Sequence, residues 1–225
     1  MSKNRIKTEC DRCGICCTKG GPSLHYEDRN LLLNNRLNLE HLITIRKGEP
    51  VLSLSTGDPE PTQSEIVKIK GRGTEWTCIF FQEKEAKCTI YEHRPLECSL
   101  LKCWDTENLE NVVGRNLLSR YDIIASQDPI VPFIKAIDEQ CLLENLAQQL
   151  SALSRENSRN QALADLTHLV NTDLAIRSQA FAELRFSLDL ELFFFGRPLF
   201  KILNQYGIET HEANGTCTLS LIPSL

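Results

Sequence analysis

Apolar residues in the second half of the chain recur at intervals of three and four positions. This spacing is typical of an α-helix with one buried face. It runs through four segments, which are 133–153, 161–170, 174–186 and 197–206. In the last of them Pro198 stands near the start, where a helix tolerates proline best. The pattern predicts a mainly helical region in the second half of the chain.

The first half carries a different pattern of short segments. Residues 65–70 alternate apolar and charged positions, which is typical of a half-buried strand. Residues 78–81 and 87–91 are rich in aromatic and β-branched side chains and are joined by the polar run 82–85. Two such runs with a short polar link predict a β-hairpin. We therefore expect strands in this half.

Short helices are expected around these strands. The first is predicted to begin near Glu27, and the second to cover 38–47. The third begins at Pro95 and carries Cys98, and the fourth covers 107–120. Residues 51–61 are rich in proline, glycine, serine and threonine, so they are predicted to form a loop.

These patterns predict an α+β fold in two parts. Residues 1–125 form a small cysteine-rich domain that is centred on a metal and contains the short β-hairpin. Residues 126–225 form a mainly helical extension. The extension ends in a second hairpin over 208–221, whose turn is Asn214-Gly215. We expect the helical extension to offer the surface for a protein partner or substrate.

Composition narrows the class of protein. Hydrophobic residues make up 41% and charged residues 24% of the 225 positions, which is typical of a globular protein. The formal net charge of −5 weighs against a nucleic-acid partner held by bulk charge. The longest apolar runs are too short to span a bilayer. The first residues, 1–7, are polar and basic and do not resemble a secretory signal, so we expect a cytoplasmic protein.

Cysteine is the residue whose distribution carries the most chemistry. Four cysteines fall within one run of eight residues, and these are Cys10, Cys13, Cys16 and Cys17. Four more follow before the middle of the chain, namely Cys78, Cys88, Cys98 and Cys103. A reducing compartment disfavours disulfides. We therefore expect two sets of four metal ligands, because four thiolates complete a zinc or an iron–sulfur site.

The spacing within the first run bears on which metal is bound. Cys10, Cys13 and Cys16 repeat the three-ligand spacing of bacterial ferredoxins, in which a remote cysteine completes a 4Fe–4S cluster. Cys17 directly follows Cys16, so one of this pair is expected to serve a second metal or a second iron, or to lie outside the coordination sphere. We favour an iron–sulfur cluster, and a zinc ion that only stabilises the fold is the alternative.

Seven of these cysteines stand in an order that resembles a known family. The run Cys10-x-x-Cys13-x-x-Cys16-Cys17 is followed by Cys78-Ile-Phe-Phe and by Cys88-Thr-Ile-Tyr-Glu-His-Arg-Pro-Leu-Glu-Cys98. Over residues 8–105 this pattern is similar to that of the CxxCxxCC family of zinc- or iron-chelating domains. Flagellin lysine methylases carry a similar cysteine cluster, and that resemblance implies an iron–sulfur centre used in methyl transfer. Cys103 is an eighth cysteine without a clear place in the family pattern.

Arg94 and Tyr91, which precede Cys98 in the sequence, are candidates for a role beside the metal. Arg94 could offset the charge of a thiolate centre or bind an anionic group, or it could form only a salt bridge to Glu92 or Glu97. Tyr91 could pack beneath the hairpin or donate its hydroxyl to sulfur. His93 is a weaker candidate ligand, because enough cysteines are present without it.

Three functions stay open on these grounds. The first is a metalloprotein whose iron–sulfur cluster serves an enzyme acting on a protein substrate, in the manner of methyl transfer. The second is a zinc-stabilised binding module without catalysis. The third is a protein that takes up zinc or iron and passes it on, which the surplus of thiols in one short loop suggests. Cys141 and Cys217 lie on predicted apolar faces and are expected in the core.

Overall fold

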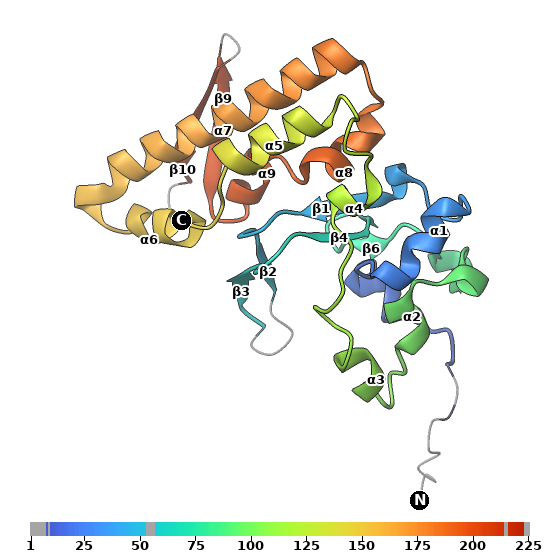
Figure 1. The fold of residues 1–225 in the computed structure, drawn as a ribbon. Helices are drawn as coiled ribbons and strands as arrows, with labels where there is room; N and C mark the ends of the chain where they lie inside the picture. The colour runs from blue at the N-terminus through green and yellow to red at the C-terminus, as the bar shows by residue number, and fades with distance from the viewer. Residues whose placement is uncertain (1–7, 9, 53–56, 214–215, 223–225) are drawn as a thin grey trace, which may run out of the picture. The chain divides into compact units, whose positions relative to one another are not determined.

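The computed structural model describes residue 8 and residues 10–52, 57–213 and 216–222. The chain divides into two compact units (Figure 1). Unit 1 comprises Met1–Ile43 and Ile66–Ile123, and unit 2 comprises Thr44–Glu65 and Ile124–Leu225. All eight clustered cysteines therefore belong to unit 1, whereas the segment that starts at Thr44 belongs with the helical half of the chain.

Unit 1 is built from short helices and strands. Its helical elements, with 3₁₀ helices labelled η, are η1 (Cys17–Lys19), η2 (Tyr26–Asp28), α1 (Arg29–Leu33), η3 (Leu39–His41), η4 (Glu83–Glu85), η5 (Tyr91–His93), α2 (Leu96–Leu100), α3 (Glu107–Glu110) and α4 (Arg120–Ile123). Its strands are β4 (Ile66–Ile69), β5 (Gly71–Arg72), β6 (Thr77–Cys78), β7 (Phe81–Gln82) and β8 (Lys87–Cys88). The helices predicted near Glu27 and after Pro95 are confirmed as η2 with α1 and as α2.

Two-stranded sheets position the second set of cysteines. The antiparallel pair β5–β6 places Cys78 opposite Gly71, and the antiparallel pair β7–β8 places Cys88 opposite Phe81. The strand predicted at 65–70 is confirmed as β4, which pairs with β1 (Leu42–Ile45). The predicted hairpin is confirmed only in part, because Cys78 and Cys88 lie in different sheets.

Two helices predicted for the first half are wrong. Over 38–47 the structure has η3 and then β1, whose four residues are all buried. A strand buried on both faces is apolar throughout, so it lacks the alternation that identifies a half-exposed strand. Over 107–120 the helix α3 covers only four residues. The positive φ of Gly114 (74°) and Asn116 (49°) then takes the backbone out of helical geometry.

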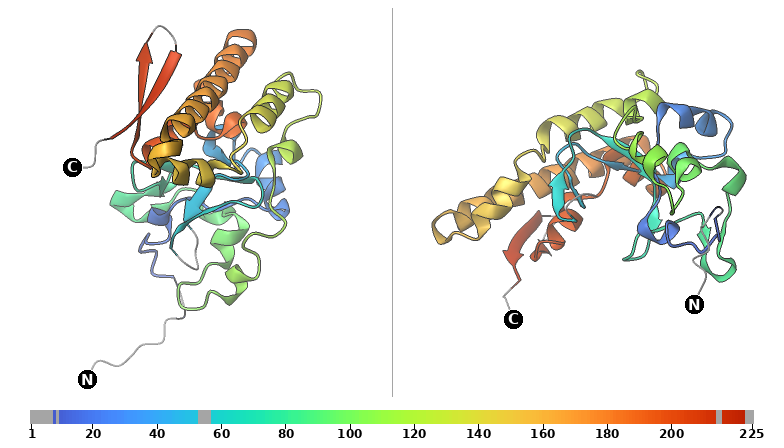
Figure 2. Two further views of the ribbon diagram at one scale, coloured as in Figure 1. Left: turned by 90° about the vertical axis from the view of Figure 1, so that its left-hand side faces the viewer. Right: turned by 90° about the horizontal axis from the view of Figure 1, so that it is seen from below.

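Unit 2 is built against one long helix, α7 (Figure 2). Its helices are α5 (Val131–Gln140), α6 (Leu146–Leu153), α7 (Glu156–Leu184), η6 (Leu188–Leu190), α8 (Glu191–Phe195) and α9 (Leu199–Asn204). Its strands are β2 (Pro50–Leu52), β3 (Pro59–Pro61), β9 (Ile208–Ala213) and β10 (Thr216–Leu221). The views agree that the β9–β10 hairpin lies alongside α7, and α5, α6 and α9 also pack on that helix.

The helices predicted for the second half are present, but their lengths differ. Segments 161–170 and 174–186 form the single helix α7. The polar residues between these two segments, 171–173, stay helical because their side chains bind other parts of unit 2. Asn171 donates from Nδ2 to the carbonyl of Cys217 at 2.7 Å and accepts the Cys217 N–H at 2.9 Å, which fixes β10 to α7. The segment 133–153 is divided into α5 and α6 instead of forming one helix.

Two hairpins complete unit 2. The loop predicted at 51–61 is wrong at its two ends, where β2 and β3 pair with Pro50 opposite Pro61, and its residues 53–56 lie outside the described residues. The hairpin predicted at 208–221 is confirmed as β9 and β10. Its predicted turn, Asn214-Gly215, lies outside the described residues, as does the predicted absence of a secretory signal in residues 1–7.

A buried ion network ties the segment between β1 and β4 to the helices of unit 2. Asp173 on α7 accepts from Arg177 Nε at 2.9 Å and lies 3.4 Å from Arg46 Nη1. Glu49, also fully buried, accepts from Arg197 Nε at 2.7 Å. Each buried charge has a partner of opposite sign, which offsets the cost of removing it from water. These pairs explain why a segment that lies within the cysteine half of the sequence belongs to unit 2.

The α+β class predicted from the sequence is confirmed by the mixture of helices and small antiparallel strand pairs. The apolar core of unit 2 includes Leu146, Leu166 and Ile202, all with no exposed surface. The aromatic run Phe193–Phe195 is buried as well. Within the described ranges, no helix is long and apolar enough to cross a membrane.

Candidate metal centre

The first cysteine run folds as a tight loop that leads into η1. Two of its residues have positive φ, Arg12 at 55° and Gly14 at 78°. The backbone N–H of Arg12 donates to Cys10 Sγ at 3.3 Å, and the N–H of Thr18 donates to the carbonyl of Gly14 at 3.0 Å. Left-handed residues reverse the chain direction within a few positions. The run is therefore folded back on itself and is not extended.

Glycines seat this run against the strands of unit 1. A Cβ on Gly14 would overlap the ring of Phe81 in β7, and a Cβ on Gly21 would lie 2.4 Å from the carbonyl oxygen of Ile69 in β4. Only a residue without a side chain permits such approaches. The helix η1 also packs on β6, which carries Cys78. The first run thus lies beside the strands that carry the second set of cysteines.

Five of the eight predicted ligands lie within electrostatic range of one another, and these are Cys16, Cys17, Cys78, Cys88 and Cys98. Cys98 on α2 is their common neighbour. Burial raises the pKa of Cys98, and the charges of Cys78, Cys88 and Cys16 raise it further. The structure therefore brings the end of the first run together with three cysteines of the second set.

Cys16 and Cys17 have opposite properties although they are adjacent. A hydrogen bond from the Cys17 side chain lowers the pKa of Cys16 to about 6, even though partial burial acts in the other direction. The same hydrogen bond and burial raise the pKa of Cys17. The positive charge of Arg94 also lowers the pKa of Cys16. Cys16 is therefore a thiolate at neutral pH, which is the form of cysteine that binds metals.

Cys78 and Cys98 are neutral thiols at the same pH. Burial raises the pKa of both, and the nearby charge of Cys88 raises it further. A metal cation among these sulfur atoms reverses that effect, because its positive charge stabilises each thiolate. A group made only of sulfur donors fits zinc or an iron–sulfur cluster better than magnesium or calcium, which prefer oxygen.

The other three predicted ligands are not linked to this group by the charges that act on it. Cys10, Cys13 and Cys103 are exposed, as is Cys16 of the group. None of them is among the main causes of the shifted pKa values of the grouped cysteines. In the part of the chain that the structure describes, no three His, Cys, Asp or Glu side chains already have the spacing of a metal site. The predicted metal at the centre of unit 1 therefore stays a proposal.

A buried carboxylate fixes the start of the helix that carries Cys98. Asp28 is 3% exposed. It accepts the N–H of Leu96 at 2.8 Å with one oxygen and the N–H of His25 at 2.9 Å with the other. Burial raises the pKa of Asp28, and these two hydrogen bonds oppose that shift. Asp28 thus acts as a clamp between the segment that precedes α1 and the first turn of α2.

Glu97 makes a second connection to the same segment. Its carboxylate accepts the N–H of Ser23 at 2.9 Å and lies 3.2 Å from His25 Nε2. Glu97 is therefore engaged with His25, and the salt bridge to Arg94 considered from the sequence is not formed among the described residues. No sequence pattern marked Asp28 or Glu97 as a positioning residue. The available signal was a glutamate directly before a cysteine ligand.

Arg94 lies beside the grouped cysteines in a stack with Tyr91. The guanidinium carbon of Arg94 is 3.8 Å from the centre of the Tyr91 ring, and that of Arg12 is 4.6 Å from the same centre. The Nε of Arg94 is buried and has no hydrogen-bond partner in the described part of the chain. An unpaired cationic donor at this position suits a negatively charged metal–thiolate group.

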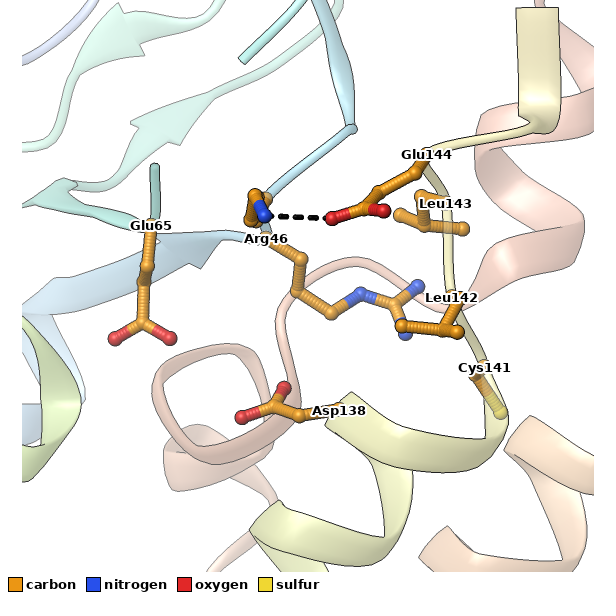
Figure 3. Close-up of a pocket in the computed structure, with 8 residues that line it drawn as sticks. Arg46, Glu65, Asp138, Cys141, Leu142, Leu143 and Glu144 are labelled. Atoms are coloured by element: carbon orange, nitrogen blue, oxygen red, sulfur yellow. Dashed lines mark ion pairs between the residues drawn. The ribbon is translucent and has the colours of Figure 1, made fainter. Parts of the chain in front are cut away.

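Unit 2 contains a separate cavity of about 200 Å³ (Figure 3). It is lined by Arg46, Lys47, Glu65, Asp138, Cys141, Leu142, Leu143 and Glu144. Lys47 Nζ and Glu144 Oε1 form an ion pair of 2.6 Å at this cavity. None of the eight predicted ligands lines it. Cys141 and Cys217 are buried, as predicted.

Comparison with known proteins assigns the cysteine region to a family. Residues 9–116 match the CxxCxxCC family, which is described as "Putative zinc- or iron-chelating domain". The match spans all eight predicted ligands, so the resemblance read from the sequence is confirmed for this segment. We refer to residues 9–116 as the CxxCxxCC domain, after the family model that they match. No curated protein and no solved structure matches the chain.

Proposed function

We propose that the CxxCxxCC domain binds its metal through Cys16, Cys78, Cys88 and Cys98. These residues supply four sulfur donors, the number that a tetrahedral zinc ion or a 4Fe–4S cluster requires. The observation that carries the proposal is the grouping of these thiols around Cys98 from four separate segments of unit 1. Cys17 then serves as the hydrogen-bond donor that keeps Cys16 in its thiolate form.

In its more specific form, the proposal assigns an iron–sulfur cluster to this centre, with zinc as the alternative. The similar cysteine cluster of flagellin lysine methylases, which implies an iron–sulfur centre, supports the cluster; the ferredoxin-like spacing does not bear on this centre, because Cys10 and Cys13 are not among its proposed ligands. A bound cluster would supply electron transfer, whereas zinc would supply folding stability. We further propose that the chain is an enzyme that modifies a protein substrate, and that unit 2 supplies the surface that binds this substrate. The resemblance to the cysteine cluster of flagellin lysine methylases supports this step.

The test is to purify the full chain without oxygen and to measure its metal, its acid-labile sulfide and its visible spectrum. Iron and sulfide in equal amounts with broad visible absorption support the cluster. Stoichiometric zinc in a colourless protein supports the alternative and excludes the cluster. A protein that binds neither metal contradicts the proposal in both forms. The matched control is Cys217→Ser, which lies in the core of unit 2 and should leave the metal content unchanged.

A metal-handling function is a second candidate, and the exposure of the three cysteines outside the proposed ligand set favours it. Cys10, Cys13 and Cys103 are open to solvent, so they could receive metal from a partner or pass it on. This function predicts that zinc leaves rapidly to a competing chelator while the circular dichroism of the protein is retained. Slow release, or unfolding together with release, contradicts it. Replacing Cys10 and Cys13 by serine should slow the release.

A further inference from the structure

The stack of Arg12, Tyr91 and Arg94 connects the two cysteine segments of unit 1. Arg12 belongs to the first cysteine run, whereas Tyr91 and Arg94 belong to the segment before Cys98. Both guanidinium groups lie within cation–π distance of the same ring. Each such contact contributes about 0.5–1 kcal/mol when partly exposed. The ring orients the two cations, but it does not neutralise their charge.

Arg94 has a donor group that needs an acceptor. Its Nε is buried without a hydrogen-bond partner among the described residues. A buried donor left unpaired costs about 1–3 kcal/mol, and more when it is charged. Of the two acidic candidates in this segment, Glu97 is engaged with Ser23 and His25, and Glu92 forms no salt bridge to Arg94 among the described residues. The geometry therefore calls for an acceptor other than a carboxylate of the same segment.

The charge of the proposed centre supplies such an acceptor. Four thiolates around a zinc ion, or around a 4Fe–4S cluster in its 2+ state, leave a net charge of −2 on the group. Anionic sulfur accepts hydrogen bonds from charged donors. The charges of Arg72 and Lys68 act on Cys78, so more than one cation favours negative charge on the grouped cysteines. Arg94 is close enough to Cys16 for its charge to act on that thiol.

We propose that Arg94 donates its Nε–H to a sulfur atom of the metal–thiolate centre, and that Tyr91 and Arg12 hold its guanidinium in that position. This inference rests on the proposed metal site. It assigns the arginine and the tyrosine of the Tyr91-x-x-Arg94 signature to one task, which is hydrogen bonding and charge balance around the metal. Arg12 fulfils the same task from the first cysteine run.

The test loads the full chain with Co²⁺ alone as the probe. Competition with a chelator of known affinity measures binding, and the thiolate-to-cobalt charge-transfer absorption reports on the sulfur donors. We expect Arg94→Met to bind Co²⁺ about 10–100-fold more weakly than wild type, as is usual when a group that hydrogen-bonds a ligand is removed. The charge-transfer band should shift in the same variant. Arg94→Lys keeps the charge but lacks Nε, so its affinity for Co²⁺ should lie between those of wild type and Arg94→Met.

The matched control is Arg36→Met, because Arg36 is an exposed arginine of unit 1 away from the cysteines. It should bind Co²⁺ like wild type. Equal affinity and an unshifted band in Arg94→Met overturn the inference. If that variant does not fold, the Tyr91 variants decide: Tyr91→Phe keeps the ring and should bind normally, whereas Tyr91→Leu should bind weakly. Equal binding by these two variants also overturns it.

Failure of the inference is distinguishable from failure of the proposed function. If wild type binds Co²⁺, Cys98→Ser does not, and Arg94→Met equals wild type, only the role of Arg94 is wrong. If wild type and Cys98→Ser bind Co²⁺ equally, or if neither binds it, the proposed centre itself is wrong. Binding by wild type with weakened binding in both variants supports both statements.

Discussion

Gly14 lies directly against the ring of Phe81, so closely that a Cβ on Gly14 would be 2.0 Å from Phe81 Cζ. Phe81 in turn stands opposite Cys88 in the β7–β8 pair. This contact therefore sets the distance between the first cysteine run and one cysteine of the second set. The φ of Gly14, 78°, also disfavours any residue with a side chain. Packing and backbone conformation both require glycine at this position.

We expect Gly14→Ala to lift the first cysteine run away from β7 and to reduce the metal content of the purified protein. The positive φ alone costs alanine about 1–2 kcal/mol, and the overlap with the Phe81 ring adds about 1–3 kcal/mol. The matched control is Gly114→Ala, because Gly114 has a φ of 74° but nothing within 4 Å of an added Cβ. Metal analysis and urea unfolding measure the two effects. Equal metal content in both variants would show that the Phe81 contact does not hold the loop.

Asp28 offers a test of how α2 is positioned. In Asp28→Asn only one oxygen remains, so either the N–H of Leu96 or that of His25 faces an amide donor. We expect a loss of about 1–3 kcal/mol in the free energy of unfolding and a lower metal content, because α2 carries Cys98. Glu27→Gln removes a charge from the neighbouring exposed residue and is the matched control. The clamp is refuted if the two variants unfold at the same urea concentration.

Sequence signals predicted the fold well where one local feature decides the structure. The alternation at 65–70 gave the strand β4, and Pro95 marked the start of α2. They failed where tertiary contacts decide. The strand β1 is buried on both faces and was taken for a helix. The polar residues Asn171 and Asp173 interrupt the apolar pattern of α7, yet both bind other parts of unit 2, so the helix continues through them.

Asp173 is expected to be essential for the stability of unit 2. It lies between Arg177 and Arg46, all three of them buried. Asp173→Asn leaves the buried Arg46 without its countercharge and leaves Arg177 with Glu191 alone, which costs about 3–5 kcal/mol. Asp165→Asn on the exposed face of the same helix should change stability by less than about 0.5 kcal/mol. Denaturant unfolding followed by circular dichroism provides both values, and similar values for the two variants would contradict the network.

Cys141 is expected to lower the stability of the fold at alkaline pH. Burial, followed by the charge of Asp173, raises its pKa from 9.0 to about 12, while Arg46 and Arg177 act in the opposite direction. The unfolded chain can ionise this thiol above pH 9.0, whereas the folded chain cannot until about pH 12. Ionisation therefore favours unfolding, and wild type should lose stability relative to Cys141→Ala as the pH rises through this window.

The comparison between the two proteins isolates Cys141, because every other group that titrates in this range is common to both. Below pH 9.0 the difference in their free energies of unfolding should be constant. A difference that stays constant up to the most alkaline pH at which both proteins fold would show that Cys141 ionises normally in the fold.

The candidate site was predictable in composition but not in arrangement. Cysteine spacing alone identified the eight candidate ligands and the family. Which of them lie together depends on strand pairing and on contacts such as that between Asp28 and Leu96, which are 68 positions apart. No local pattern carries that information. The exposure of Cys103 could not be predicted for the same reason.

The most direct test of the central claim compares the metal content of Cys98→Ser with that of Cys103→Ser, both purified without oxygen beside wild type. Both residues were candidate ligands from the sequence, but only Cys98 lies among the grouped thiols. The account predicts that Cys98→Ser loses the metal and that Cys103→Ser keeps the wild-type amount. Metal retained in Cys98→Ser, or lost in Cys103→Ser alone, would contradict it.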